Sequence, residues 1–571
     1  MKKIVGIVLG LAVVVAIGFT ILRLGKTEGN AYARFLPPDV VGTVNLSHGN
    51  TLIDNFAASP LGKVFTKDTI HAIVQEMGGQ SQGIAEYDRV YDAVAKMAHD
   101  PAIRAVFGDD ATLALLPPDR KILADKPAEA LRDCPVVIAR TSVAGALDML
   151  SRLMTNAQIS RETVDGLDLV KIGTGQGQVF YGYTQGQTVF LALSPAAIKA
   201  CLAAGKGETA LDKAPAFKEA AAFWQTFPEE TTYFRTYFNT PAVAELLQLA
   251  PAPEIKEAGE MLAGVGTMYS IDYETSQGME SRGRAGLTYD RLHSAMKNLL
   301  DAAAKGNQTL HLLQEQVLAY NWAASLQTEQ ILTAMAANEQ EYQEVDRGVQ
   351  QNLGVSLQEL VRAFGPRYGA VLDDIVHTPL FPWPKMILFV EIRDRAIAEK
   401  ALNGVRRLVA DQGISTEKQE QVEGLTVYSW PIMPGEAQPA AVLTADMLYL
   451  STSKQALKTM LAVKRSPNVL AAPVAAQVGQ ELSTRLQAAN FSNFIVFPAR
   501  MARQVGETVD WLGAILASSK HISLERFNRE LVQLMQSTEL VAVTSQVTKE
   551  RVEWAATIAK AKKPAAGAGG Q

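Results

Sequence analysis

Acidic side chains stand in adjacent pairs at two places in the sequence, and such pairs are the first candidates for chemistry. Asp109 and Asp110 form one pair, and Asp373 and Asp374 form the other. General acid–base catalysis and calcium binding both use carboxylates, but normally at alternating or remote positions that converge in space. Neither pair lies in a D-x-D-x-D-G loop, and the two pairs do not align between the halves of the chain. We therefore interpret them as helix-capping or solvated loop residues.

Metal binding is the second kind of chemistry that the residue types allow. None of the histidines lies in H-E-x-x-H or in another spacing that would place two imidazoles on one helix face. The seven histidines are at positions 48, 71, 99, 293, 311, 377 and 521. Two cysteines, Cys134 and Cys201, exclude a disulfide scaffold and a four-cysteine zinc site. They form either one disulfide in an oxidising compartment or, the preferred interpretation, two separate buried thiols.

A glycine-rich stretch at 173–178, Gly-Thr-Gly-Gln-Gly-Gln, has the composition of a phosphate-binding loop. Such a loop needs a helix directly after it, whose first amides face the phosphate. The residues that follow, Val-Phe-Tyr-Gly-Tyr at 179–183, are typical of a strand. We therefore expect a hairpin turn here. The sequence predicts no catalytic, cofactor-binding or metal-binding residues and no cofactor, although a site assembled from remote residues stays open.

The composition is that of an ordinary globular protein, with 48% hydrophobic and 20% charged residues among 571. The net charge is −5, but the first 34 residues carry +4, so the rest of the chain carries −9. A general nucleic-acid-binding protein needs a basic face to neutralise phosphates. An acidic body of this size argues against that class.

The amino-terminal segment predicts a membrane anchor. Residues 4–22 contain no charge, and nineteen helical residues extend about 28 Å, enough to cross a hydrocarbon core. A cleaved signal peptide would have a shorter apolar region. We expect a transmembrane signal anchor over residues 1–30, with the bulk of the chain in the periplasm of a bacterium and the anchor in its inner membrane. Gly6 and Gly10 have the spacing of a small-xxx-small pair, which is compatible with a homodimer through this helix.

An internal duplication is the strongest organisational signal. The apolar positions of a predicted helix at 142–156 recur 255 residues later, in the helix that contains Ala398 and Val409. The neighbouring segments match in the same order, including Val-Asp-Gly-Leu at 164–167 with Val-Glu-Gly-Leu at 422–425. Ser194 and Ser453 stand where matching helices should begin. Further matches pair 40–45 with 316–321, 107–108 with 364–365, 135–139 with 386–390, 189–194 with 447–451 and 233–238 with 493–497.

Each copy closes on a predicted antiparallel hairpin, at 268–287 and at 540–558, in which apolar residues alternate. The predicted fold is therefore α+β: an N-terminal transmembrane helix followed by two tandem divergent copies of one domain built from an antiparallel sheet and helices. The predicted organisation is an anchor at 1–30, copy one at 34–287, a helical connection at 288–309, copy two at 310–560 and a disordered tail at 561–571.

The layout resembles a bacterial family of membrane-anchored, extracytoplasmic proteins that is defined only as a domain of unknown function. The features that carry the resemblance are Leu-Pro-Pro-Asp at 36–39 before a strand, the two Phe-Gly elements, the Val-Asp-Gly-Leu step and the strand-to-helix step at Leu193 and Ser194. The resemblance covers most of residues 34–560. It implies no activity and no functional residues.

Three classes of function follow from this organisation. The first is a non-catalytic binding or scaffolding protein of the bacterial envelope, in contact with envelope proteins. The second is a carrier of a lipid or other apolar ligand at the membrane surface. The third is an enzyme whose site is assembled from remote residues. We prefer the first, because the residues that recur between the copies are apolar, glycine or turn-forming.

Overall fold

The chain folds into two compact units, Met1–His293 and Ser294–Gln571, in a computed structural model. The boundary falls inside the segment 288–309 that the sequence analysis predicts as a connection. The structure describes residues 30–78, 81–107, 110–141, 158–173, 179–207, 209–249, 253–378, 380–433, 435–520 and 522–561.

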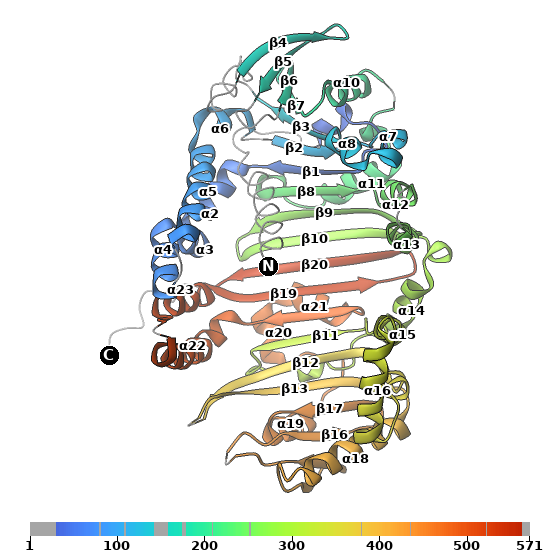
Figure 1. Cartoon of the computed structure of the whole chain (residues 1–571), viewed down its shortest axis with the longest axis vertical. Coiled ribbons are helices and arrows are strands. Elements are labelled where there is room, and N and C mark those ends of the chain that lie inside the picture. The colour runs from blue at the N-terminus through green and yellow to red at the C-terminus, as the bar shows by residue number, and fades with distance from the viewer. Residues whose placement is uncertain are drawn as a thin grey trace. The chain divides into compact units, whose positions relative to one another are not determined.

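The described part of the first unit contains ten strands that pair antiparallel in the order β4-β5-β6-β7-β3-β2-β1-β8-β9-β10, as Figure 1 shows from top to middle. These strands are β1 (Gly42–Ser47), β2 (Asp110–Leu115), β3 (Pro135–Arg140), β4 (Gln158–Val164), β5 (Leu167–Gly173), β6 (Val179–Gln185), β7 (Thr188–Ala192), β8 (Thr232–Phe238), β9 (Val265–Thr275) and β10 (Gly278–Leu287).

The helices of the first unit lie between these strands along the chain. They are η1 (Ala31–Phe35), α2 (Gly49–Ala58), α3 (Pro60–Val64), α4 (Lys67–Glu76), α5 (Ser81–His99), α6 (Pro101–Phe107), α7 (Arg120–Asp125), α8 (Pro127–Arg132), α10 (Pro195–Ala204), η2 (Leu211–Lys213), α11 (Pro215–Trp224), η3 (Glu229–Thr231), α12 (Thr240–Gln248), α13 (Pro253–Met261) and η4 (Tyr289–Arg291).

The second unit repeats the strand order of the first, with every strand number raised by ten. Its described residues form ten antiparallel strands in the order β14-β15-β16-β17-β13-β12-β11-β18-β19-β20. The strands are β11 (Ala319–Ala323), β12 (Phe364–His377), β13 (Pro382–Ile392), β14 (Lys418–Val422), β15 (Leu425–Ser429), β16 (Ala440–Leu443), β17 (Met447–Ser451), β18 (Ser492–Val496), β19 (Thr538–Val547) and β20 (Arg551–Lys560). This is the order expected if both units descend from one ancestral domain.

The helices of the second unit again lie between the strands along the chain. They are α14 (Ser294–Ala303), η5 (Leu310–Leu312), α15 (Thr328–Ala336), α16 (Glu339–Leu353), α17 (Leu357–Arg362), α18 (Arg395–Asp411), α19 (Lys454–Leu461), α20 (Ala472–Val478), α21 (Gln480–Ala488), α22 (Pro498–Lys520) and α23 (Glu525–Gln536).

Local sequence chemistry explains several of these boundaries. The hairpins β4–β5 and β14–β15 each turn on two residues with positive φ, Asp165 with Gly166 and Glu423 with Gly424. Such two-residue turns match the twist of the strands that they join. The predicted helix starts are confirmed, because the Ser194 hydroxyl accepts the Ala197 N–H before α10 and Ser453 caps α19 in the same way.

The main core of each unit lies between one face of its sheet and helices, and smaller buried clusters lie on the opposite face. In the first unit α11 lays Phe217 and Trp224 against Tyr237 of β8, and the Trp224 Nε1 donates a hydrogen bond to the Ser270 carbonyl over 2.9 Å. In the second unit Leu457 of α19 joins a core that includes Trp322. Burial of these large aromatic side chains contributes to the hydrophobic stabilisation of each unit.

One part of the predicted fold is corrected. Among the described residues no helix has both the length and the apolar character that a membrane crossing requires. The predicted N-terminal transmembrane helix, and with it the single-pass inner-membrane location, therefore finds no support in the structure. Residues 4–22, which carried that prediction, and Gly6 and Gly10 lie outside the described residues, as do the predicted helix at 142–156 and residues 562–571 of the tail.

The packing of the second sheet generates a test at Gly369 of β12. A Cβ atom at this position would lie 2.2 Å from the Asn321 carbonyl oxygen and 2.4 Å from the Phe389 ring. The backbone of Asn321 would have to move to make room for the new methyl group. Gly369→Ala should therefore lower the free energy of unfolding by about 3 kcal/mol. The matched control is Gly348→Ala in α16, where nothing lies within 4 Å of the new Cβ. It should raise stability by roughly 0.5–1 kcal/mol. Urea unfolding measures both variants, and equal midpoints would contradict the packing described.

Candidate ligand-binding pocket

Most of the residues that the sequence suggests as candidates for catalysis or metal binding do not come together among the described residues. His71 lies 2.6 Å from Asp88, and His377 lies 3.1 Å from Glu507, each in a simple pair. The described residues contain no group of three side chains that could hold a metal ion, and His521 lies outside them. The histidines therefore do not converge on a site within the described ranges.

The two cysteines are free, buried thiols. This agrees with the preferred interpretation and not with the disulfide. Burial raises the pKa of Cys134 to about 11 and that of Cys201 to about 12. Both side chains are therefore neutral near pH 7 and behave as small apolar groups.

The glycine-rich stretch joins two paired strands. Gly173 at the end of β5 faces Val179 at the start of β6, and β6 is a strand where a phosphate loop would need a helix. Residues 174–178 themselves lie outside the described part of the chain.

Short sequence patterns at 79–83, 294–297 and 451–454 match motifs of serine hydrolases. Residues 79–83 read Gly-Gln-Ser-Gln-Gly, but Ser81 begins α5, and the described element before it is the helix α4 and not the strand of a nucleophile elbow. Residues 451–454 read Ser-Thr-Ser-Lys, and the buried Ser451 hydroxyl donates hydrogen bonds to the Met386 and Ser453 carbonyls. The Ser451 hydroxyl is therefore occupied by main-chain contacts.

Asp110 differs from the prediction for the acidic pairs. It is neither a helix cap nor a solvated loop residue, since it lies in β2 with only 5% of its surface exposed. Asp373 and Asp374 also lie in a strand, β12, and Asp109 lies outside the described residues. Asp110 is the residue on which a candidate site can be built.

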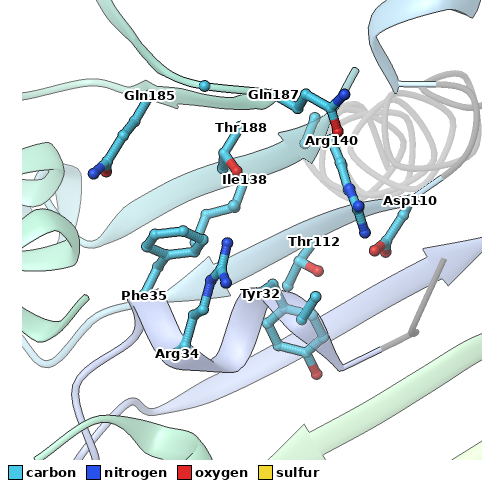
Figure 2. Close-up of a pocket in the computed structure, with 13 residues that line it drawn as sticks. Tyr32, Arg34, Phe35, Asp110, Thr112, Ile138, Arg140, Gln185, Gln187 and Thr188 are labelled. Carbon is cyan, nitrogen blue, oxygen red and sulfur yellow. The ribbon is translucent and has the colours of Figure 1, made fainter. Parts of the chain in front are cut away.

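A cavity of about 340 Å³ opens over Asp110 in the first unit. Its polar lining consists mainly of Arg34, Asp110, Arg140, Gln185, Gln187 and Thr188. Figure 2 shows Arg140 extending toward Asp110 from the end of β3, while Arg34 extends from η1 toward the same cavity. Phe35 and Ile138 give the cavity an apolar wall.

The walls of the cavity are held by main-chain contacts. Gly186 and Gln187 form the two-residue turn between β6 and β7, and Gly186 adopts a φ of 61° that favours glycine. The Thr141 N–H donates to the Gln187 carbonyl over 2.8 Å, which ties this turn to the end of β3. On the other wall the Phe35 ring packs edge-to-face on Phe190, with centroids 5.2 Å apart.

A network of buried polar side chains holds Asp110 in place. The Asn45 Nδ2 donates hydrogen bonds to Asp110 Oδ1 over 2.5 Å and to Thr112 Oγ1 over 3.0 Å. Arg235 of β8, only 1% exposed, donates to the Ser47 hydroxyl over 2.9 Å and forms an ion pair with Glu229. Buried polar groups satisfied in this way fix one arrangement of side chains.

Burial dominates the electrostatics of Asp110. It raises the pKa of this carboxyl to about 6, although the hydrogen bond from Asn45 and the positive charges of Arg235 and Arg140 act to lower it, and the charge of Glu229 acts to raise it. A carboxyl in a cavity with such a pKa is typical of functional sites.

Unlike Asp110, the two arginines of the cavity are not held in place by hydrogen bonds with other described residues. Neither the Arg34 nor the Arg140 guanidinium forms a hydrogen bond or an ion pair with any residue in the described part of the chain. The Arg34 guanidinium instead lies over the Phe35 ring, 4.6 Å from its centroid. Two positive charges at the cavity are therefore without a partner among the residues that the structure describes.

At the positions equivalent to Asp110 and Arg140, the second unit has charged side chains that pair with each other. Thr112 faces Ile138 in the first sheet, as Gly369 faces Phe389 in the second. On the first strand of each pair, the residue two positions earlier is Asp110 in the first unit and Arg367 in the second. On the second strand of each pair, the residue two positions later is Arg140 in the first unit and Glu391 in the second. The charges at equivalent positions are thus reversed.

The reversed pair in the second unit is complete. Arg367 donates to Glu391 from Nε over 2.9 Å and from Nη2 over 2.5 Å, and both side chains are buried. Burial acts to raise the pKa of Glu391, but the hydrogen bonds and charge of Arg367, together with Lys305 at 3.5 Å, leave it below its ordinary value. Next to this pair Trp322 takes the place that Asn45 has in the first sheet, so the match of 40–45 with 316–321 in the sequence is out of register by one residue. The described residues thus place an open cavity in one unit and a closed ion pair in the other.

Another cavity, of about 380 Å³, lies in the second unit beside α18. Its charged lining residues, Arg395 and Glu399, pair with each other over 2.7 Å. This cavity therefore offers a ligand fewer free charges than the cavity at Asp110.

The raised pKa of Asp110 has a consequence for the stability of the first unit. An aspartate whose pKa rises from 3.8 to about 6 on folding keeps its proton in the native state where the unfolded chain has lost it. Stability is therefore fully present below pH 4 and falls as pH rises through about 6, by roughly 3 kcal/mol. Asp110→Asn cannot ionise and should abolish this part of the pH dependence. Urea unfolding between pH 4 and 7 measures the difference between variant and wild type, and parallel profiles would show that Asp110 does not titrate as described.

Comparison with known proteins places the chain in a family without assigning an activity. Comparison with curated proteins and with solved structures gave no significant match. A family model described as a protein of unknown function (DUF3352) matches residues 100–553, which is well over half of the chain. The resemblance to a family of unknown function is thereby confirmed, and the chain belongs to the DUF3352 family.

Proposed function

We propose that the protein is a binding protein whose first unit holds a small polar molecule in the cavity at Asp110. The observation that carries the proposal is the contrast between the units. At equivalent positions of the two units, Asp110 and Arg140 border an open cavity, whereas Arg367 and Glu391 form a buried ion pair. Unpaired charges beside a cavity cost stability, and a ligand that pairs with them offsets that cost.

The size and lining of the cavity favour a small polar ligand over a lipid. A volume of about 340 Å³ corresponds to about eleven water molecules at their share of liquid volume. Arg34, Asp110 and Arg140 would each have to lose solvent against an acyl chain without gaining a partner. The alternative of a carrier for an apolar ligand therefore has less support than the binding of a small polar molecule.

An enzyme that uses Asp110 as an acid or base is the second candidate. The pKa of about 6 favours it, because such a carboxyl exchanges a proton readily near neutral pH. Among the described residues that line the cavity, however, there is no histidine, cysteine or lysine that could share proton transfer or act as a nucleophile. Binding requires fewer additional groups and is the preferred proposal.

Blocking the mouth of the cavity tests the proposal. Gln187 is exposed in the turn between β6 and β7 and lines the cavity. Gln187→Trp should fill the entrance without disturbing the core, and Gln225→Trp, at an exposed position after α11, is the matched control. The full chain, exposed to a library of small polar metabolites and examined by native mass spectrometry, should retain a bound compound.

The expected result is that Gln187→Trp loses the compound, with binding at least tenfold weaker, while Gln225→Trp keeps it. Thermal unfolding of both variants without ligand verifies that they remain folded. If both tryptophan variants bind like wild type, or if wild type retains no compound, the cavity is not the binding site that we propose. Turnover of a bound compound that stops in Asp110→Asn would favour the enzyme instead.

A further inference from the structure

Charges of opposite sign border the same cavity in the first unit, and this arrangement restricts the ligand. Asp110 lies on its floor, while Arg140 and Arg34 approach from β3 and η1. A simple anion would approach the Asp110 carboxylate as well as the guanidinium groups, and a simple cation would meet two like charges. A molecule with both charges satisfies each group.

In the second unit, the side chains at the equivalent positions provide a partner for each other's charge. There the side chains of Arg367 and Glu391 reach each other across the strands and form two charge-assisted hydrogen bonds. In the first unit Asp110 is one methylene shorter than a glutamate, and its carboxyl is held by the hydrogen bond from Asn45 in β1, the strand on the side away from Arg140. These two features keep Asp110 and Arg140 from closing as an ion pair.

We propose that the ligand is a small zwitterion of the α-amino acid class, whose ammonium group binds Asp110 and whose carboxylate binds Arg140 and Arg34. This inference rests on the proposed function, since it names the ligand of the same cavity. The ligand supplies in the first unit the two charges that close the pair in the second. A carboxylate accepts two parallel hydrogen bonds from a guanidinium, and an ammonium group supplies three donors to carboxylate and hydroxyl oxygens.

The rest of the cavity fits an uncharged side chain. Phe35 and Ile138 form an apolar wall, and Thr112 and Thr188 add hydroxyl groups. A volume of about 340 Å³ accommodates the backbone of an amino acid together with a side chain of moderate size. Additional negative charge on the side chain would approach Asp110 and is disfavoured.

The test uses the purified full chain and defined probes. Isothermal titration with a panel of L- and D-α-amino acids that have neutral side chains should identify at least one that binds. For leucine, the matched analogues with a single charge are 3-methylbutylamine and 4-methylpentanoate, and equivalent pairs exist for other members of the panel. We expect each single-charge analogue to bind about tenfold more weakly or worse than its parent, because each loses one charge-assisted contact.

Variants assign the two charges to residues. Asp110→Asn and Arg140→Gln should each weaken the amino acid about tenfold or more. Arg132→Gln, the same type of change at an exposed position of α8, should leave the affinity unchanged. Moreover, Asp110→Asn should weaken the amine analogue but not the carboxylate analogue, and Arg140→Gln should do the reverse, a split that general unfolding would not produce.

The outcomes separate this inference from the proposed function. If no amino acid binds while the metabolite library yields another compound that Gln187→Trp releases, the zwitterion is wrong and the cavity still binds a small molecule. If a carboxylate analogue binds as tightly as its amino acid, the role of Asp110 is likewise overturned. If neither experiment yields a compound, both proposals fall together.

Discussion

Residues that face each other across an antiparallel ladder must point to the same side of the sheet, and this constraint creates the cavity in the first unit. Asp110 of β2 is opposite Ser47 of β1 on one side and Arg140 of β3 on the other. The next row on the same face contains Thr112 and Asn45. Because the pleat alternates with a period of two, one register brings polar side chains from separate strands into two neighbouring rows. A shift by one residue would turn all of them to the opposite face.

Much of the fold could be predicted because its signals are local. The turn at Asp165 and Gly166, the helix caps at Ser194 and Ser453, and the closing hairpins all depend on residues within a few positions of each other. Repetition of these local signals at nearly constant spacing also predicts that the halves resemble each other, and the strand orders agree with this expectation. The predicted transmembrane helix at the amino terminus finds no support, because no helix among the described residues has the length and apolar character to cross a membrane.

The cavity could not be predicted, because its parts are far apart in the sequence. Asn45 and Asp110 are 65 residues apart, and Arg235 lies 190 residues beyond Asn45. An aspartate beside another aspartate favours a loop, and only the alternation of Asp110, Thr112 and Ala114 along one face of a strand signals a buried polar row. That alternation is visible in the sequence, but its pairing with Asn45 and Arg140 depends on a register that no local signal fixes.

The two units show alternative solutions to the same energetic problem. Charged side chains at buried positions of a sheet lose hydration, and an ion pair compensates for this loss only when its geometry is good. Arg367 and Glu391 achieve that geometry, with Trp322 opposite Gly369 in the neighbouring row. Asp110 instead remains without a counter-ion in direct contact, and its pKa of about 6 expresses the cost of ionising it there. A shift of about two units corresponds to roughly 3 kcal/mol, which is a substantial share of the stability of a domain. Local instability of this size is characteristic of positions that are retained for binding rather than for folding, and the first unit has it where the second unit does not.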